Sequence, residues 1–201
     1  SWGCRRWPGP GGSSSGAERG VADPFADVDG WPRQLSWSDF QERSVRPPGV
    51  HENAEIRYDF PPGNFRLVRR GGDILIDPDS ISVALEVDAS ETWVLRGGED
   101  EPRTRSGSES EKLLRHEQGH FDLAGLAAAA MARRFRELRG SSASALQTDL
   151  HDAKNEIDEV CDDLQERYDH ETEHGLDEQA QERWNRRIRR AIQEERPEEF
   201  Y

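Results

Sequence analysis

Lysine, cysteine and long apolar segments are scarce in this chain. Only Lys112 and Lys154 are lysines among 27 basic residues, whereas 41 residues are acidic, and the formal net charge is −14. Hydrophobic residues make up 33% of the 201, and no apolar run approaches the ~20 residues that a membrane-spanning helix needs. We therefore expect no transmembrane segment. Because a negatively charged surface repels phosphates, the composition also argues against nucleic acid as a partner.

The charge balance carries information about the surroundings of the protein. A composition that is acidic, poor in lysine and rich in arginine is typical of halophilic proteins, because high salt screens the repulsion between surface carboxylates. A GC-rich genome that favours arginine codons would lower the lysine count in the same way. Under either explanation we expect a solvated, acidic surface.

The two cysteines, Cys4 and Cys161, cannot form a disulfide framework. Cys4 precedes a stretch rich in Gly, Ser and Pro, which is compatible with the remnant of a lipoprotein cleavage site and a membrane tether through Cys4. No apolar signal core precedes it in the given chain. Cys161 lies in a helical pattern, where we expect a small core residue.

The sequence divides into a tail and one domain. Residues 1–30 are rich in Gly, Ser, Pro and Asp and show no periodicity, which is typical of a disordered linker. Regular patterns start at the Leu-Ser-Trp-Ser-Asp-Phe segment of residues 35–40. We therefore predict a disordered tail over residues 1–34 and a single domain over residues 35–195.

Strand patterns come first in this domain and helix patterns second. Between residues 54 and 60, apolar residues alternate with polar ones, as in a strand with one buried face. Shorter strands are expected over residues 65–68, 74–76, 81–87 and 92–95, a polar loop over 96–108, and helices over 108–139, 146–164 and 176–192. This order predicts an α+β fold with a small, antiparallel-rich sheet followed by three helices.

The first helix carries a His-Glu-x-x-His motif at His116, Glu117 and His120. Residues four apart lie on the same face of a helix, so both imidazoles can be directed at a single ion. Glu117 can reach a water bound to that ion, whose pKa Zn²⁺ lowers to about 7, and can take its proton during attack on a carbonyl. The motif therefore predicts a zinc-dependent hydrolase with one zinc per chain.

A catalytic zinc takes three protein ligands and keeps one open position. Candidates for the third ligand cluster where the second helix ends, before Gly175, at His170, Glu171, Glu173 and His174. The end of a helix can direct a ligand inward, and glycine there permits a tight reversal. Spacing alone does not choose among these four residues.

These segments resemble a known family. Residues 113–123, which read LLRHEQGHFDL, resemble the signature of a bacterial and archaeal family described as predicted secreted zinc-dependent proteases and long filed as domain of unknown function 922. Residues 35–40 are similar to the opening of the family, and residues 92–94 resemble its Ser-Trp-Val strand. Its closing pattern is matched by Tyr168-Asp169, Thr172, His174-Gly175, Gln181 and Trp184. The resemblance covers about residues 35–192.

The resemblance implies His174 as the third zinc ligand, in preference to His170. It also implies a zincin-like fold, an extracytoplasmic location (secreted or at the cell surface) and a metallopeptidase, most simply an endopeptidase acting on a peptide or protein substrate. The cleavage specificity is not encoded in any motif of the sequence.

Three further residue groups suit supporting roles in such a site. Asp122 can accept the ring N–H of a ligand histidine and so fix its tautomer. Tyr168 can donate a hydrogen bond to a developing oxyanion. By analogy with zinc metallopeptidases, the strand over residues 92–95 can line the cleft and bind an extended peptide.

Two alternatives use the same residues. Glu117-x-x-His120 and Glu171-x-x-His174 are two Glu-x-x-His units, as in di-iron carboxylate helix bundles, but the segment before Glu117 reads as strands rather than as a further helix. A non-catalytic, zinc-stabilised binding protein is the second alternative, because a motif does not by itself establish turnover. Glu117 favours catalysis, since a structural zinc site needs no general base.

Overall fold

The computed structural model describes residues 25–61, 63–96 and 107–201, and it has the mixed α+β architecture expected from the sequence. Nine short strands precede three helices in this part of the chain. The strands are β1 (Val28–Asp29), β2 (Gln41–Arg43), β3 (Ala54–Glu55), β4 (Tyr58–Asp59), β5 (Leu67–Arg70), β6 (Asp73–Ile76), β7 (Val83–Ala84), β8 (Glu86–Val87) and β9 (Trp93–Leu95). Short 3-10 turns occur at Trp37–Asp39, Pro78–Ser80 and Pro197–Glu199.

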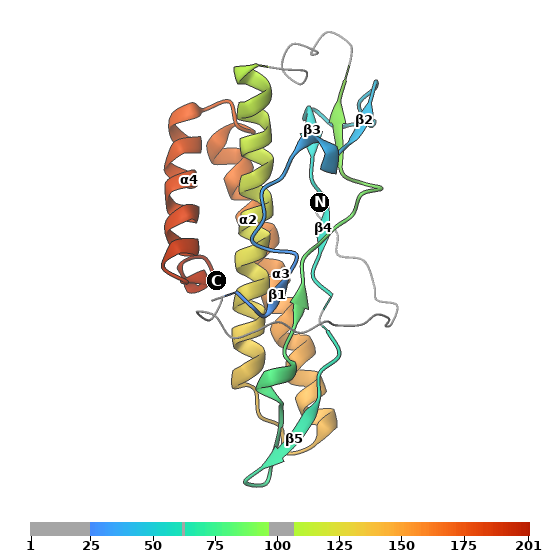
Figure 1. Cartoon of the computed structure of the whole chain (residues 1–201), viewed down its shortest axis with the longest axis vertical. Coiled ribbons are helices and arrows are strands. Elements are labelled where there is room, and N and C mark those ends of the chain that lie inside the picture. Colours follow the sequence, from blue (N-terminus) through green and yellow to red (C-terminus); the bar gives the residue numbers. More distant parts are fainter. Residues whose placement is uncertain (1–24, 62, 97–106) are drawn as a thin grey trace.

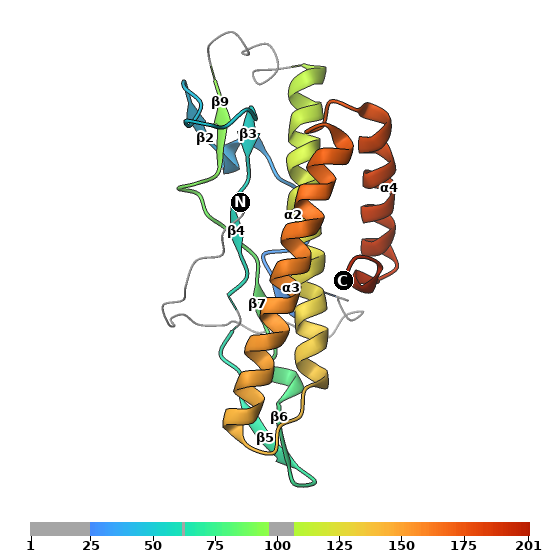
Figure 2. The same cartoon turned by 180° about the vertical axis from the view of Figure 1, so that it is seen from behind.

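The three helices are α2 (Ser108–Glu137), α3 (Ala143–Thr172) and α4 (Glu178–Gln193). The long helix α2 lies at the centre, with the strand segments on one side and α4 on the other, as both views show (Figures 1 and 2). Alanines and glycines along α2 allow this close packing, because their small side chains let neighbouring segments approach the helix backbone closely. Gly125 lies directly under the Trp31 ring, where an added Cβ would come within 2.1 Å of a ring carbon.

The strands form four small sheets rather than one. The three-stranded sheet has the order β2-β9-β3, and the other sheets are the pairs β1–β7, β4–β8 and β5–β6. Three of the five pairings are antiparallel, whereas β1–β7 and β2–β9 are parallel. The β5–β6 hairpin turns at Gly71 and Gly72, which both have positive φ.

The single strand expected between residues 54 and 60 is wrong in detail. It divides into β3, which pairs with β9, and β4, which pairs with β8. Between them, the backbone N–H of Ile56 donates to a carboxylate oxygen of Glu117, and the N–H of Arg57 donates to the Oγ1 of Thr92. The alternating pattern is local and does not reveal that the chain leaves one sheet for another at this bend.

The packed region begins earlier than residue 35. Phe25, Val28 and Trp31 are buried, and Val28 pairs with Val83 across the parallel β1–β7 ladder. The packed region therefore includes residues that we assigned to the tail. The sequence did not indicate this, because three apolar residues within a polar stretch give no periodic signal. Residues 1–24 of the expected tail, with Cys4, lie outside the described residues, as does most of the expected 96–108 loop.

The third helix starts later than its apolar stripe suggests. Leu176 precedes α4 and is exposed, and Asp177 caps the helix by accepting from the backbone N–H groups of Gln179 and Ala180. Trp184 and Cys161 are buried in the core, as expected. Among the described residues, none of the helices has the length and apolarity needed to cross a bilayer.

Candidate metal centre

Two histidines of α2 meet in the interior of the molecule. His116 and His120 are each only 3% exposed, and their Nε2 atoms lie 3.2 Å apart. Their rings are nearly perpendicular, with centroids 4.7 Å apart. The i, i+4 spacing therefore directs both imidazoles at one point, as the motif predicts.

The third member of the cluster is Asp169 of α3. Its Oδ1 atom lies 3.0 Å from the Nε2 of His116 and 2.8 Å from the Nε2 of His120. These three residues could together hold a metal ion. Asp169 is absent from our sequence-based ligand candidates, although it adjoins Tyr168 in the closing pattern quoted above. Its contact with α2 joins helices that are separate in sequence, so no local spacing indicates it.

His174 lies at the rim of this cluster. Its Nδ1 atom is 3.6 Å from the Oδ1 of Asp169 and 3.7 Å from the Oε1 of Glu52, and about half of its side chain is exposed. Three consecutive residues at the end of α3, Glu173, His174 and Gly175, have positive φ angles of 50°, 53° and 79°. A non-glycine residue rarely adopts this conformation, and such strain gathers at functional sites. The left-handed turn brings His174 back toward Asp169.

The other three candidates from this segment lie away from the cluster. His170, Glu171 and Glu173 are exposed. The Oε2 atom of Glu171 accepts from the indole N–H of Trp184. These residues therefore do not contribute to the group around His116.

Glu117 faces the same cavity from α2. It is 3% exposed, and its Oε2 atom accepts from the backbone N–H of Ile56 at 3.1 Å. Burial raises the pKa of Glu117 to about 7, and the nearby His120 opposes that rise. The position next to the two histidines, combined with contact with the cavity, suits a proton acceptor.

The charges of the cluster are strongly coupled. Burial lowers the pKa of His120, but the Asp169 carboxylate outweighs burial and raises it overall. Burial likewise raises the pKa of Asp169, but His120 and His116 hold it well below the usual range. Burial dominates at His116 and lowers its pKa. The Asp169 carboxylate is therefore held in its ionised form by its hydrogen bonds and charge interactions with the two imidazoles.

A cavity of about 420 Å³ opens onto the cluster. His116, Glu117, His120, Asp169 and His174 contribute to its wall. The rest of the wall comes from the segment that includes β3 and from two leucines: Gly49, Val50, His51, Glu52, Asn53, Ala54, Glu55, Arg57, Leu113 and Leu176.

Tyr168 does not have the geometry expected of an oxyanion donor. Its hydroxyl donates to the backbone carbonyl of His116 at 3.0 Å, and its ring stacks on the His116 ring at a centroid distance of 4.8 Å. The side chain is fully buried and does not line the cavity. On α3, the side chain of residue 168 points about 100° away from that of residue 169. Tyr168 therefore contacts His116 on the side that faces away from the cavity.

Asp122 also differs from its predicted role. Its Oδ1 atom accepts from the indole N–H of Trp31 at 3.1 Å and from the amide of Gln118 at 3.0 Å, so it fastens the N-terminal segment to α2. The ring Nδ1 atoms of the two histidines instead face glutamines. His116 lies 3.0 Å from the Oε1 of Gln181, and His120 lies 2.5 Å from the Oε1 of Gln165.

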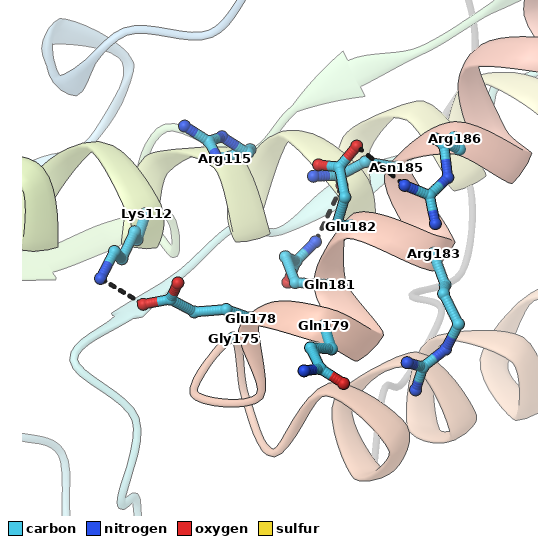
Figure 3. A pocket seen from close by; sticks show the side chains of 10 residues that line it. All are labelled: Lys112, Arg115, Gly175, Glu178, Gln179, Gln181, Glu182, Arg183, Asn185 and Arg186. Carbon is cyan, nitrogen blue, oxygen red and sulfur yellow. Dashed lines mark hydrogen bonds and ion pairs between the residues drawn. The ribbon is translucent and has the colours of Figure 1, made fainter.

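A larger hollow of about 590 Å³ lies between α2 and α4 (Figure 3). Its charged walls pair with one another, as in the Lys112–Glu178 hydrogen bond and the Glu182–Arg186 ion pair. None of its lining residues is a histidine or a cysteine. We therefore place the candidate centre in the smaller cavity.

A comparison with known families finds one that matches most of the chain. Residues 30–175 match the family described as "Bacterial protein of unknown function (DUF922)". The matched region includes the motif on α2 and Asp169, and it ends before α4. Neither the curated proteins nor the solved structures include a match to the chain. The chain belongs to the bacterial family of unknown function DUF922.

Proposed function

We propose that this protein is a zinc-dependent hydrolase that cleaves peptide bonds. The observation that carries the proposal is the convergence of His116, His120 and Asp169 in the wall of a cavity that Glu117 also lines. Two histidines that can bind a metal ion, with an acid beside them and a cavity in front, suit metal-assisted hydrolysis.

The donor set fits zinc. Two imidazole nitrogens and one carboxylate oxygen are ligands that Zn²⁺ takes, at about 2.0–2.2 Å each. Tetrahedral ligands at such distances lie about 3.3 Å from one another, close to the 2.8–3.2 Å separations of these three atoms. Zn²⁺ supplies a Lewis acid that activates water at neutral pH.

Residues of the chain would orient and deprotonate the reacting groups. The Ile56 N–H fixes one carboxylate oxygen of Glu117. Among the described residues, the other oxygen has no hydrogen-bond partner, so it is free to accept a proton from a water molecule in the cavity. His174, at the rim, would contact the substrate or complete the ligand set.

The neighbouring strand supports a peptide as the substrate. Strand β3 lies at the edge of its sheet, since it pairs only with β9 among the described strands, and Ala54 and Glu55 line the cavity. An open strand edge binds an extended peptide through main-chain hydrogen bonds. The strand that we expected in this role, β9, lies between β2 and β3 and is buried, so both of its edges are occupied.

The di-iron alternative finds little support in the geometry. It needs Glu171 and His174 to point inward from one helix, but Glu171 is exposed and bonded to Trp184, and His174 lies beyond the end of α3. The described residues include three helices, one fewer than such a bundle uses. A non-catalytic zinc protein remains the second candidate.

A matched pair of variants tests the proposal. Glu117→Gln keeps the shape of the side chain but removes its basicity, and Glu111→Gln makes the same change at an exposed position of α2. Zinc content is measured first, followed by digestion of a peptide library with the zinc-loaded proteins at several salt concentrations. We expect one zinc per chain in all three proteins and peptide cleavage that falls by about 10²–10⁴-fold only in Glu117→Gln. Full zinc loading without cleavage by the wild type would favour the non-catalytic alternative.

A further inference from the structure

The orientation of the Gln165 amide is determined by its surroundings. Its Nε2 atom donates to the backbone carbonyl of His120 at 3.1 Å, a contact that only the NH₂ end of the amide can make. The oxygen end must therefore be the atom that lies 2.5 Å from the Nδ1 of His120. A reversed amide would place two oxygen atoms in contact. Because Gln165 is fully buried, no water can relieve such a contact.

The Gln181 amide is oriented by a different chain of contacts. The Tyr168 hydroxyl has a single hydrogen, which it donates to the carbonyl of His116, so its oxygen can only accept at its other contact. The Nε2 atom of Gln181 donates to this oxygen at 2.6 Å and to the Oδ1 of Asn185 at 2.9 Å. Gln181 Oε1 therefore faces the Nδ1 of His116. Figure 3 shows Gln181 between α2 and α4, beside Asn185.

These contacts close a ring of hydrogen bonds. It runs from the His116 carbonyl to Tyr168, from Tyr168 to Gln181, and from Gln181 back to the Nδ1 of His116. The ring ties α4 to the motif helix behind the metal centre. Gly175 packs against the same imidazole, where an added Cβ would lie 3.0 Å from the Cγ of His116.

We propose that Gln165 and Gln181 hold His120 and His116 as Nδ1–H tautomers, so that both Nε2 lone pairs point at the site shared with Asp169. An amide oxygen only accepts, so each Nδ1 atom must carry the hydrogen. A neutral imidazole then has its lone pair on Nε2. Two lone pairs and a carboxylate oxygen converge within 3.2 Å, so they repel one another unless a proton or a metal cation lies among them. The glutamines thus prepare the site for a metal before one arrives.

Both are positioning residues, and the amide is suited to the task because it stays neutral. A carboxylate would take part of the Nδ1 proton and add negative charge to a site that already holds Asp169 and Glu117. The inference rests on the proposed metal site but not on hydrolysis. It also extends the site onto α4, which follows the residues 30–175 that match the family model.

The first test measures the tautomers directly. Long-range ¹H–¹⁵N correlation spectra of histidine-labelled protein distinguish a protonated ring nitrogen from an unprotonated one. In the metal-free wild type at alkaline pH, where both rings are neutral, we expect Nδ1–H at His116 and His120. In the zinc-loaded protein we expect Nε2 to be the bound atom. Nε2–H tautomers in the metal-free protein, or zinc on Nδ1, would overturn the proposal even if the protein proved to be an active hydrolase.

The second test separates the tautomer effect from the packing of α4. Gln181→Met and Gln181→Glu both lose the donor to Tyr168, but only methionine also loses the acceptor for Nδ1. We expect the methionine variant to bind zinc about 10–100-fold more weakly, and the glutamate variant to keep the Nδ1–H tautomer and to recover most of that affinity. Gln165→Met and Gln165→Glu should differ in the same way at His120.

Exposed glutamines of the same helices provide the controls, Gln179→Met on α4 and Gln147→Met on α3, and zinc affinity should stay unchanged in both. Figure 3 shows that Gln179 points away from Gln181. Equal zinc affinity in the methionine variants, the glutamate variants and the controls would show that the glutamines only fill space. If a methionine variant fails to fold, the tautomer spectra of the wild type still decide the question.

Discussion

Gly119, between Glu117 and His120, offers a sharp test of how the motif helix packs on α3. A glycine inside a helix usually costs about 1 kcal/mol relative to alanine, so Gly119→Ala would stabilise an isolated α2. In the folded protein the added Cβ would lie 2.1 Å from the Oη of Tyr168 and 2.6 Å from its Cζ. Tyr168 cannot move aside freely, because its ring is fully buried and packed against the rings of both site histidines.

Overpacking of this kind typically lowers stability by about 1–3 kcal/mol. Displacing the Tyr168 hydroxyl would also leave the buried His116 carbonyl without its hydrogen-bond donor, which costs about 1–3 kcal/mol more. We therefore expect Gly119→Ala to lower the free energy of unfolding by about 2–4 kcal/mol after the gain in helix propensity. Urea unfolding of the metal-free protein, followed by circular dichroism, measures this change.

A double-mutant cycle identifies the atom responsible. Tyr168→Phe removes the hydroxyl that the new methyl group meets first, so Gly119→Ala should cost less in the Tyr168→Phe background than in the wild type, by about 1 kcal/mol or more. A Gly119→Ala protein as stable as the wild type would refute the packing described for α2 and α3. Equal costs in the two backgrounds would show that the clash does not involve the hydroxyl.

Three other outcomes can be checked independently. In a chelator competition, Asp169→Asn should weaken zinc binding by more than about 10–100-fold, which is the range for residues that only orient metal ligands. His174→Ala should weaken zinc binding less than Asp169→Asn does. The reverse order would make His174 the third ligand. Burial raises the pKa of Asp158, although the ion pair of Lys154 with its Oδ2 opposes the rise, and its buried Oδ1 has no hydrogen-bond partner among the described residues. The folded protein therefore binds this proton more tightly than the unfolded chain. The stability of the wild type relative to Asp158→Asn should therefore fall as pH rises above the ordinary aspartate pKa of 3.8, and a difference independent of pH would contradict this. Cys161 is buried, and burial raises its pKa to about 11. A thiol reagent should therefore label Cys161 only when urea unfolds the protein. Rapid labelling of Cys161 in the native state would contradict its place in the core.

Much of the helical half could be predicted because its signals are local. The i, i+4 spacing brings His116 and His120 together on any regular helix, and the order of strand and helix patterns gives the α+β class. The sheets were harder to predict, because strands of two to four residues carry little periodicity and their partners lie far away in sequence. The burial of Phe25, Val28 and Trp31 was not predicted, for the same reason.

The sequence by itself determined that His116 and His120 share one face of a long helix and that Glu117 lies about 100° round the helix from His116, because that geometry follows from 3.6 residues per turn. Only the tertiary structure decided what meets them. Asp169 completes the cluster, and Gln165 and Gln181 face the ring nitrogens, because α3 and α4 pack against α2 at particular positions. The same packing turns Tyr168 away from the cavity. Such contacts depend on how the helices pack against one another. The spacing of residues within one helix does not indicate that packing.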